Sequence, residues 1–166
     1  MQQVYLSQEK ASDYYLKQDD EKLLHFSLQG RLPKGHTLVL STTSGVFSYI
    51  FCPDNLPRLV LQQQFTSSEV SIVLPLLKLF PHYCPYEVMF ASFYNGNVTD
   101  AVVAQCRRRL QAAFEAGTWD QEMKPIRNVL SRVRLKLRDF GLSISSILET
   151  GYVLKLVSLP EVTVDM

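Results

Sequence analysis

The residues with the clearest chemical potential lie between Pro125 and Gly141, where a predicted helix has one apolar and one basic side. The apolar residues follow a spacing of three and four, so at about 100° per residue they share one narrow arc. They are Ile126, Val129, Leu130, Val133, Leu137 and Phe140. Pro125 suits the first turn of a helix, and Gly141 suits the left-handed residue just beyond its end. We therefore predict a helix over 125–140.

The outer side of this helix is polar and almost entirely positive. Only Leu135 is apolar there, and every charge is positive until Asp139. Like charges at this spacing repel one another, so the pattern indicates a negative partner. Arginine can form two hydrogen bonds with guanine and asparagine two with adenine, so we predict that this side contacts DNA in the major groove. The candidate DNA-binding residues are Lys124, Arg127, Asn128, Ser131, Arg132, Arg134 and Arg138.

Some of these residues also allow structural interpretations. Arg134 lies beside the apolar arc and could instead pair with a carboxylate such as Glu69 or Glu87. Ser131 could serve only as a small residue that permits close approach. Lys136 is expected to be a solvated surface residue. The helix as a whole could present an ordinary solvated face or bind an anionic protein.

Composition and charge are compatible with a nucleic-acid partner without demanding one. The chain has 166 residues, of which 46% are hydrophobic and 20% charged, as in an ordinary globular protein. Its net charge is +1, but residues 1–100 carry a net charge of −2 and residues 101–166 a net charge of +3. This asymmetry permits a polyanion-binding face. The longest apolar run, Ile72–Leu77, contains Pro75 and is too short to span a bilayer, so no membrane segment is predicted.

The sequence offers little for catalysis or metal binding. Its three cysteines form no CxxC pair, and its three histidines show no HxxxH spacing. No GxxxxGK[ST], GxGxxG or GxSxG motif is present. We therefore expect no enzyme activity, no cofactor and no metal. An odd number of cysteines and the lack of a secretory signal favour reduced thiols and a cytoplasmic location.

The first half of the chain is predicted to form the support for this helix. Residues 1–22 are expected to be an arm or a short helix, and residues 23–64 to form a small antiparallel sheet, because β-branched and aromatic runs alternate with turn residues. Thr66 and Glu69 have the spacing of a capping box at the start of the next helix. Pro75 should kink or shorten that helix.

The second half is predicted to be helical until a final hairpin. The expected elements are helices over 85–93 and 101–116, the basic helix, and strands over 142–148 and 152–157. Phe80 and Phe114 are expected on the apolar sides of their helices. Trp119 is expected in the core, and the cations Arg107–Arg109 are expected to be solvated or to bind phosphate. Residues 158–166 form a tail.

The order of these elements and three separated motifs resemble the OmpR/PhoB-type effector domain of bacterial response regulators, over roughly residues 37–157. That family has a Leu-Thr-x-x-Glu pattern after a strand, as in Phe65-Thr66-Ser67-Ser68-Glu69 here. Its recognition helix reads approximately Val-His-Ile-Ser-Arg-Leu-Arg-x-Lys-Leu, and this chain keeps Ser131, Arg132, Arg134, Lys136 and Leu137. Its wing reads Ile-x-Thr-Val-Arg-Gly-x-Gly-Tyr-x-Leu, of which Ile144, Gly151, Tyr152 and Leu154 are kept.

The resemblance implies an α+β fold of the winged helix-turn-helix type over residues 23–157. It would have an N-terminal antiparallel sheet, a three-helix core and a C-terminal hairpin as the wing. It implies a transcription regulator, without a receiver domain, that binds double-stranded DNA sequence-specifically through helix 125–140. Residues 94–124 are longer than the corresponding family loop and carry their own helix, so they look like an insertion, where RNA polymerase, another transcription protein or a second copy of the chain could bind.

The wing tip departs from the family pattern. Leu148 and Glu149 stand where the family often has Arg-Gly, and a glutamate there would be repelled by phosphates. The alternative of a different class is a non-catalytic winged-helix module that binds an acidic protein through its basic or inserted helix.

Overall fold

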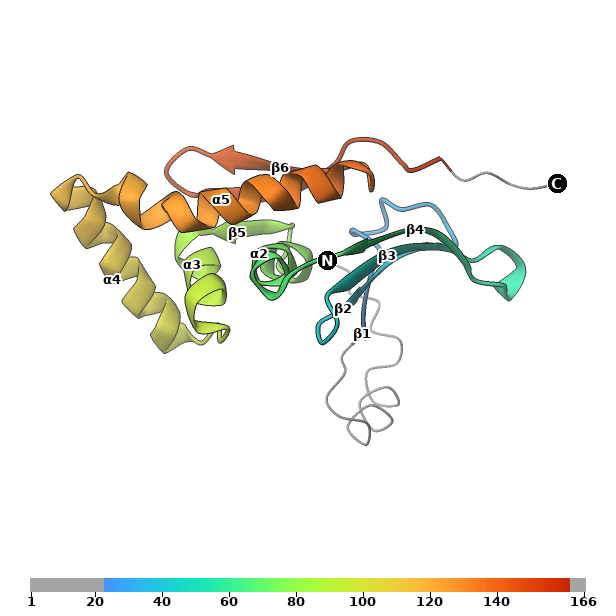
Figure 1. Ribbon diagram of the computed structural model, residues 1–166, viewed down its shortest axis with the longest axis horizontal. Coiled ribbons are helices and arrows are strands. Elements are labelled where there is room, and N and C mark those ends of the chain that lie inside the picture. The colour runs from blue at the N-terminus through green and yellow to red at the C-terminus, as the bar shows by residue number, and fades with distance from the viewer. Residues whose placement is uncertain (1–22, 162–166) are drawn as a thin grey trace, which may run out of the picture.

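The N-terminal part of the fold is a four-stranded antiparallel sheet, seen on the right of Figure 1. The computed structural model describes residues 23–161, so the arm or helix predicted at 1–22 and the last part of the tail lie outside the described residues. The strands are β1 (Leu23–Phe26), β2 (His36–Ser41), β3 (Val46–Phe51) and β4 (Arg58–Gln64), in the spatial order β1-β2-β3-β4. The prediction of an antiparallel sheet in this region is confirmed.

The remainder of the described chain contains four helices and a second, three-stranded antiparallel sheet. The helices are α2 (Ser67–Lys78), α3 (Tyr86–Asn95), α4 (Asp100–Ala116) and α5 (Trp119–Arg138). The strands are β5 (Tyr83–Pro85), β6 (Leu142–Ile147) and β7 (Gly151–Leu156), in the spatial order β5-β7-β6. The predicted hairpin is therefore confirmed, whereas β5 was not predicted. The described chain is an α+β fold, and none of its helices is long and apolar enough to cross a membrane.

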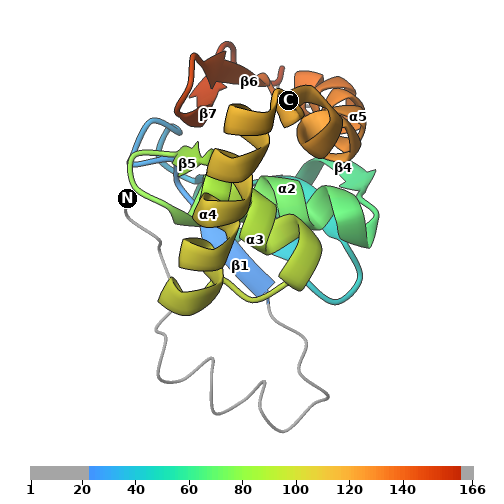
Figure 2. The ribbon, with the colours of Figure 1, turned by 90° about the vertical axis from the view of Figure 1, so that its left-hand side faces the viewer.

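Helix α5 crosses the molecule beside α2, with the three-stranded sheet along its other side (Figure 1). Figure 2 looks onto the opposite end from the four-stranded sheet, where α4 lies against α3. Every residue of the predicted apolar arc of α5 is buried in the core. The ring of Phe140 lies 4.6 Å from that of Phe47, which joins the residues just after α5 to the four-stranded sheet. Two expectations are wrong: Phe80 is 71% exposed and Phe114 is 61% exposed.

Helix α2 begins as the capping pattern predicts. The Glu69 backbone N–H donates to Thr66 Oγ1 at 3.3 Å, which confirms Thr66 as the N-cap. The helix continues past Pro75 to Lys78. Proline lacks the N–H that would bond the carbonyl of Ser71, four residues earlier. The hydroxyl of Ser92 in α3 donates to that carbonyl at 2.6 Å, so the proline leaves no buried acceptor unpaired at this position.

The contact between Ser92 and the Ser71 carbonyl gives a stability test. We expect Ser92→Ala to lower the free energy of unfolding by about 1–3 kcal/mol, because the carbonyl would lose its donor in a buried place. In a Pro75→Ala background the restored N–H can bond the same carbonyl, so the substitution at 92 should cost less there. Urea denaturation of the four chains measures both effects. Equal costs in the two backgrounds would show that Ser92 does not compensate for the proline.

The end of α2 is capped by a buried histidine. His82 Nδ1 lies 3.0 Å from the carbonyl oxygen of Leu76, which only accepts, so Nδ1 carries the proton and donates. This bond satisfies one of the last carbonyls of the helix. Burial lowers the pKa of His82 below its ordinary value. The fold therefore prefers the neutral imidazole.

We expect stability to decrease on the acid side because of this histidine. From about pH 6.5 downward the unfolded chain binds a proton at His82 that the folded chain resists, so stability is lost as the pH falls from 6.5 toward the lowered pKa of the folded state. His82→Asn should keep a donor, tolerate the positive φ of 67° at this position and lose less stability between pH 7.5 and pH 5.5 than the parent. Thermal unfolding at the two pH values tests this. An identical loss in both chains would contradict it.

Candidate nucleic-acid interface

The basic helix starts earlier than predicted. Helix α5 begins at Trp119 rather than Pro125, which lies inside it. Two features explain the early start: Asp120 and Glu122 stand at the positive N-terminal end of the helix, and Met123 extends the buried arc by one position. Pro125 has no N–H to bond the carbonyl of Gln121, four residues earlier. Gln121 is exposed, so water can take the place of that bond. The stretch before residue 125 is therefore part of the helix and not a connection to it.

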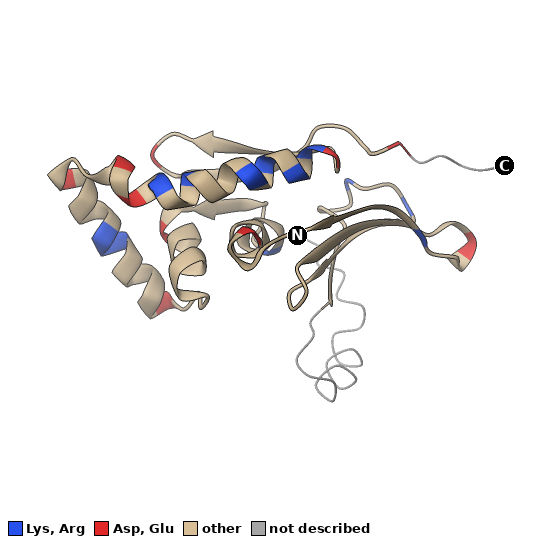
Figure 3. Cartoon of the chain, in the orientation of Figure 1, with Lys and Arg blue, Asp and Glu red and all other residues tan. Residues whose placement is uncertain are grey.

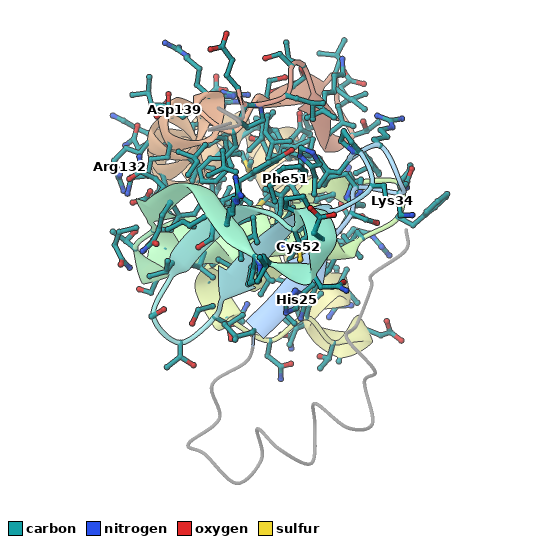
Figure 4. All side chains as sticks on the ribbon, turned by 90° about the vertical axis from the view of Figure 1, so that its right-hand side faces the viewer. His25, Lys34, Phe51, Cys52, Arg132 and Asp139 are labelled. Atoms are coloured by element: carbon teal, nitrogen blue, oxygen red, sulfur yellow. The ribbon has the colours of Figure 1, made fainter. Side chains whose placement is uncertain are left out.

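One flank of α5 is exposed along most of its length. Lys124, Asn128, Arg132 and Arg138 are exposed, and their side chains form no hydrogen bond or ion pair with any other described residue. At about 100° per residue, these four positions fall within an arc of about 120°. In Figure 3 their helix faces the viewer, with no described segment in front of it, and Figure 4 shows Arg132 pointing outward. The described chain therefore does not cover the predicted DNA-binding flank.

Leu135 lies at the centre of this arc and is 61% exposed. It is the apolar exception that the sequence predicts for the outer side. Asp139, just after the helix, lies at the same edge of the molecule as Arg132 (Figure 4). The flank thus combines cations, an amide and one aliphatic side chain.

Two further predicted residues lie on or beside this flank but have partners within the chain. Arg127 Nη1 lies 2.9 Å from Oδ1 of Asp120, one helical heptad earlier. Both side chains are well exposed, and such pairs contribute little to stability, so Arg127 can exchange this partner for another anion. Ser131 Oγ donates to the Arg127 carbonyl at 3.0 Å, a bond within its own helix.

Arg134 has neither of the carboxylate partners considered from the sequence. Its Nε donates to the carbonyl of Ile144 at 3.0 Å, and its Nη2 lies 3.5 Å from Ser146 Oγ. Both acceptors belong to β6, so Arg134 ties the β6–β7 hairpin to α5. Its place is set apart from the open flank, on the border of the buried arc.

Lys136 is not a solvated surface residue, and that expectation is wrong. Its Nζ lies 2.9 Å and 3.0 Å from the two carboxylate oxygens of Glu69, and it donates to the Gln64 carbonyl at 2.7 Å. It also lies 5.5 Å above the Phe65 ring. Glu69 is only 1% exposed. Lys136 therefore joins α5 to the end of β4 and the first turn of α2.

The arginine run in α4 is exposed, in agreement with the expectation of solvation, and two of its three members also form ion pairs. Arg107 Nη2 lies 3.4 Å from Glu87 in α3. Arg109 Nη2 lies 3.0 Å from Glu122 in α5, and its guanidinium lies 5.0 Å from the ring centre of Phe90. Arg108 is exposed and forms no ion pair with the described residues. The segment predicted as an insertion is thus held against α3 and α5 on both sides.

An aromatic cluster supports the first turns of α5. Tyr86 contacts both Trp119 and Tyr152 edge-on, with ring centres 5.3 Å and 5.2 Å apart. Trp119 is half-buried, so it lies at the edge of the core and not inside it as expected. Burial and the neighbouring Tyr86 raise the pKa of Tyr152, while the cation of Arg127 acts in the opposite direction. Both phenols therefore stay neutral at ordinary pH.

Metal-binding clusters are absent from the described part of the chain. No group of three His, Cys, Asp or Glu side chains there could hold a metal ion. The cysteines at 52, 84 and 106 are free thiols, and burial raises the pKa of Cys84 to about 12, so its thiol stays protonated. Comparisons of the chain with protein-family models, with characterised proteins and with solved structures find no match.

The pair of Lys136 and Glu69 gives the second stability test. We expect Lys136→Met to lower the free energy of unfolding by about 3–5 kcal/mol, because it leaves the buried carboxylate without its cation. Lys124→Met, on the exposed flank of the same helix, should change stability by less than about 0.5 kcal/mol. Adding Glu69→Gln to Lys136→Met should recover much of the loss. Urea denaturation measures all three chains, and equal effects at 124 and 136 would show that the pair does not hold the helix.

Proposed function

We propose that the protein is a sequence-specific regulator of transcription that binds double-stranded DNA by placing α5 in the major groove. The observation that carries this proposal is the open flank of α5, where three cations and an asparagine have no hydrogen-bond or ion-pair partner within residues 23–161. A helix fits the major groove, and these side chain types are the ones that hydrogen-bond to base edges and phosphates.

The element order supports a winged helix-turn-helix as the finer description of the fold. Helices α2, α3 and α5 pack on one another directly or through shared neighbours, and the β6–β7 hairpin lies beside α5 with β5 pairing to β7. In this proposal α5 is the recognition helix and the hairpin is the wing. Such a regulator would act in the cytoplasm.

The contacts inside the chain divide the candidate residues by role. Lys124 and Asn128 lie closest to the centre of the open flank and Arg132 lies at its edge. These three would contact base edges, together with Leu135, whose methyl groups suit the methyl group of thymine. Ser131 borders them. Arg138, at the C-terminal end, would contact phosphate. Arg127 would have to exchange Asp120 for DNA, and Arg134 would position the hairpin and not contact bases.

The proposal can be tested with a random duplex pool. Selection of bound duplexes should yield a defined sequence motif, whose affinity is then measured by fluorescence anisotropy over a salt series. We expect affinity to fall steeply with salt, because phosphate contacts release counterions. The double variant Arg127→Ala/Arg132→Ala should lose at least about tenfold in affinity at fixed salt, since each base contact contributes about 1–3 kcal/mol.

A matched control separates a specific contact from loss of charge. Arg58→Ala/Arg108→Ala removes two exposed arginines from β4 and α4 and leaves α5 unchanged. It should retain the parent's affinity within about twofold at a salt concentration where long-range attraction is screened. Circular dichroism checks that both variants fold. Equal losses in the two variants, or no selected motif, would reject α5 as the DNA-binding helix.

A further inference from the structure

A groove of about 500 Å³ lies at the end of the molecule shown in Figure 2, where α3, α4, the first turns of α5 and the β6–β7 turn meet. Its lining is mainly apolar and includes Tyr86, Leu110, Phe114, Trp119 and Leu148. The volume falls within the range of known binding pockets. Of the residues proposed to contact DNA, Arg127 alone lines this groove.

Two large apolar side chains stand exposed on facing sides of the groove. Phe114 comes from α4 and is 61% exposed, and Leu148 comes from the hairpin turn and is 85% exposed. Single exposed apolar residues are common, but a pair that flanks an apolar groove is typical of an interaction site. No described segment covers either residue. We therefore expect these two side chains to become buried against a partner and not against the chain itself.

The charges around the groove indicate which partner fits. Among the lining charges, Glu87 pairs with Arg107, and Arg127 pairs with Asp120. Glu149 lines the groove beside Leu148, is exposed and forms no ion pair with the described residues. Glu149 is therefore the one lining charge without an ion-pair partner among the described residues, and it would repel a phosphate backbone.

Glu149 is also a poor choice for its backbone position. Its φ is +60°, the left-handed region, where a residue with a side chain is less stable than glycine by about 1–2 kcal/mol. A strained glutamate next to an exposed leucine does not serve the stability of the turn. Such outliers are found where a surface has a function.

We propose that this groove binds a segment of a partner protein that presents a leucine- or phenylalanine-type side chain next to a lysine or arginine. The apolar side chain would lie between Phe114 and Leu148 above Leu110, and the cation would meet Glu149. Short protein segments with apolar anchors commonly bind in such grooves. The inference does not require that α5 binds DNA.

The experiment uses the full chain and a phage-displayed library of random peptides as the probe. Enriched peptides should share an apolar residue within one helical turn of a lysine or arginine. A synthetic peptide of that motif, measured by fluorescence anisotropy, should bind at least tenfold more weakly to Phe114→Ser and to Leu148→Ser. Leu56→Ser, which changes a leucine that is 66% exposed and lies outside the groove, should bind like the parent.

Glu149 is tested by charge exchange and by its strain. The Glu149→Lys protein should bind the lysine-containing peptide more weakly than the parent does. It should bind more tightly a peptide in which that lysine is replaced by glutamate. Glu149→Gly should raise the midpoint of thermal unfolding, because the strain is relieved, and still weaken the peptide. A loss of binding in Glu149→Lys that the glutamate peptide does not reverse would overturn the assignment of the cation to Glu149.

Several results would overturn the inference. Selected peptides that are acidic, or that bind equally to the groove variants, would reject the assigned partner chemistry. Self-association in sedimentation experiments that is lost in Leu148→Ser would identify a second copy of the chain as the occupant instead. DNA binding measured on the same variants keeps the two proposals apart, because Phe114→Ser and Leu148→Ser should leave the α5 flank intact.

Discussion

The buried carboxylate of Glu69 is the constraint on which the position of α5 depends. It lies where β4 passes into α2, accepts a hydrogen bond from the Thr66 hydroxyl and forms an ion pair with the ammonium group of Lys136. A carboxylate that is only 1% exposed needs such partners, because burying an unpaired charge is very costly. The helix must therefore lie where Lys136 reaches this point. That requirement fixes the rotation of α5 about its own axis.

Arg134 holds α5 from the side opposite to Lys136. By helical angle, Lys136 and Arg134 fall on the two borders of the buried arc, about 160° apart. Lys136 ties α5 to the β4–α2 junction, and Arg134 ties it to β6. The cations at the borders therefore hold the helix, whereas those on the outer side have either an exposed ion pair, as Arg127 has with Asp120, or no ion pair with the described residues. The cations of α5 thus have two physical roles, and the position of each around the helix axis decides whether it holds the helix or is exposed on the outer side.

Local patterns in the sequence predict much of this fold, and long-range partners account for what they miss. The strands of the first sheet, the Thr66 cap, the left-handed Gly141 and the exposed flank of α5 all follow from spacing and residue type. The partner of Lys136 is 67 residues away, and β5 exists only because it pairs with β7. The groove has no sequence signal, because four separate segments line it.

The early start of α5 connects the two proposed surfaces. A helix beginning at Pro125 would carry most of the open flank but would leave Trp119 outside it and the groove without one wall. Only Gly117 and Thr118 separate α4 from α5, and the Thr118 N–H bonds the Ala113 carbonyl at 2.8 Å, so the angle between the helices is fixed. The short junction and the ion pairs of Arg107 and Arg109 already hold the walls of the groove in place. The walls therefore lose little conformational entropy when a segment binds. Because Arg127 lines the groove and borders the flank, an occupant of one surface lies next to the other.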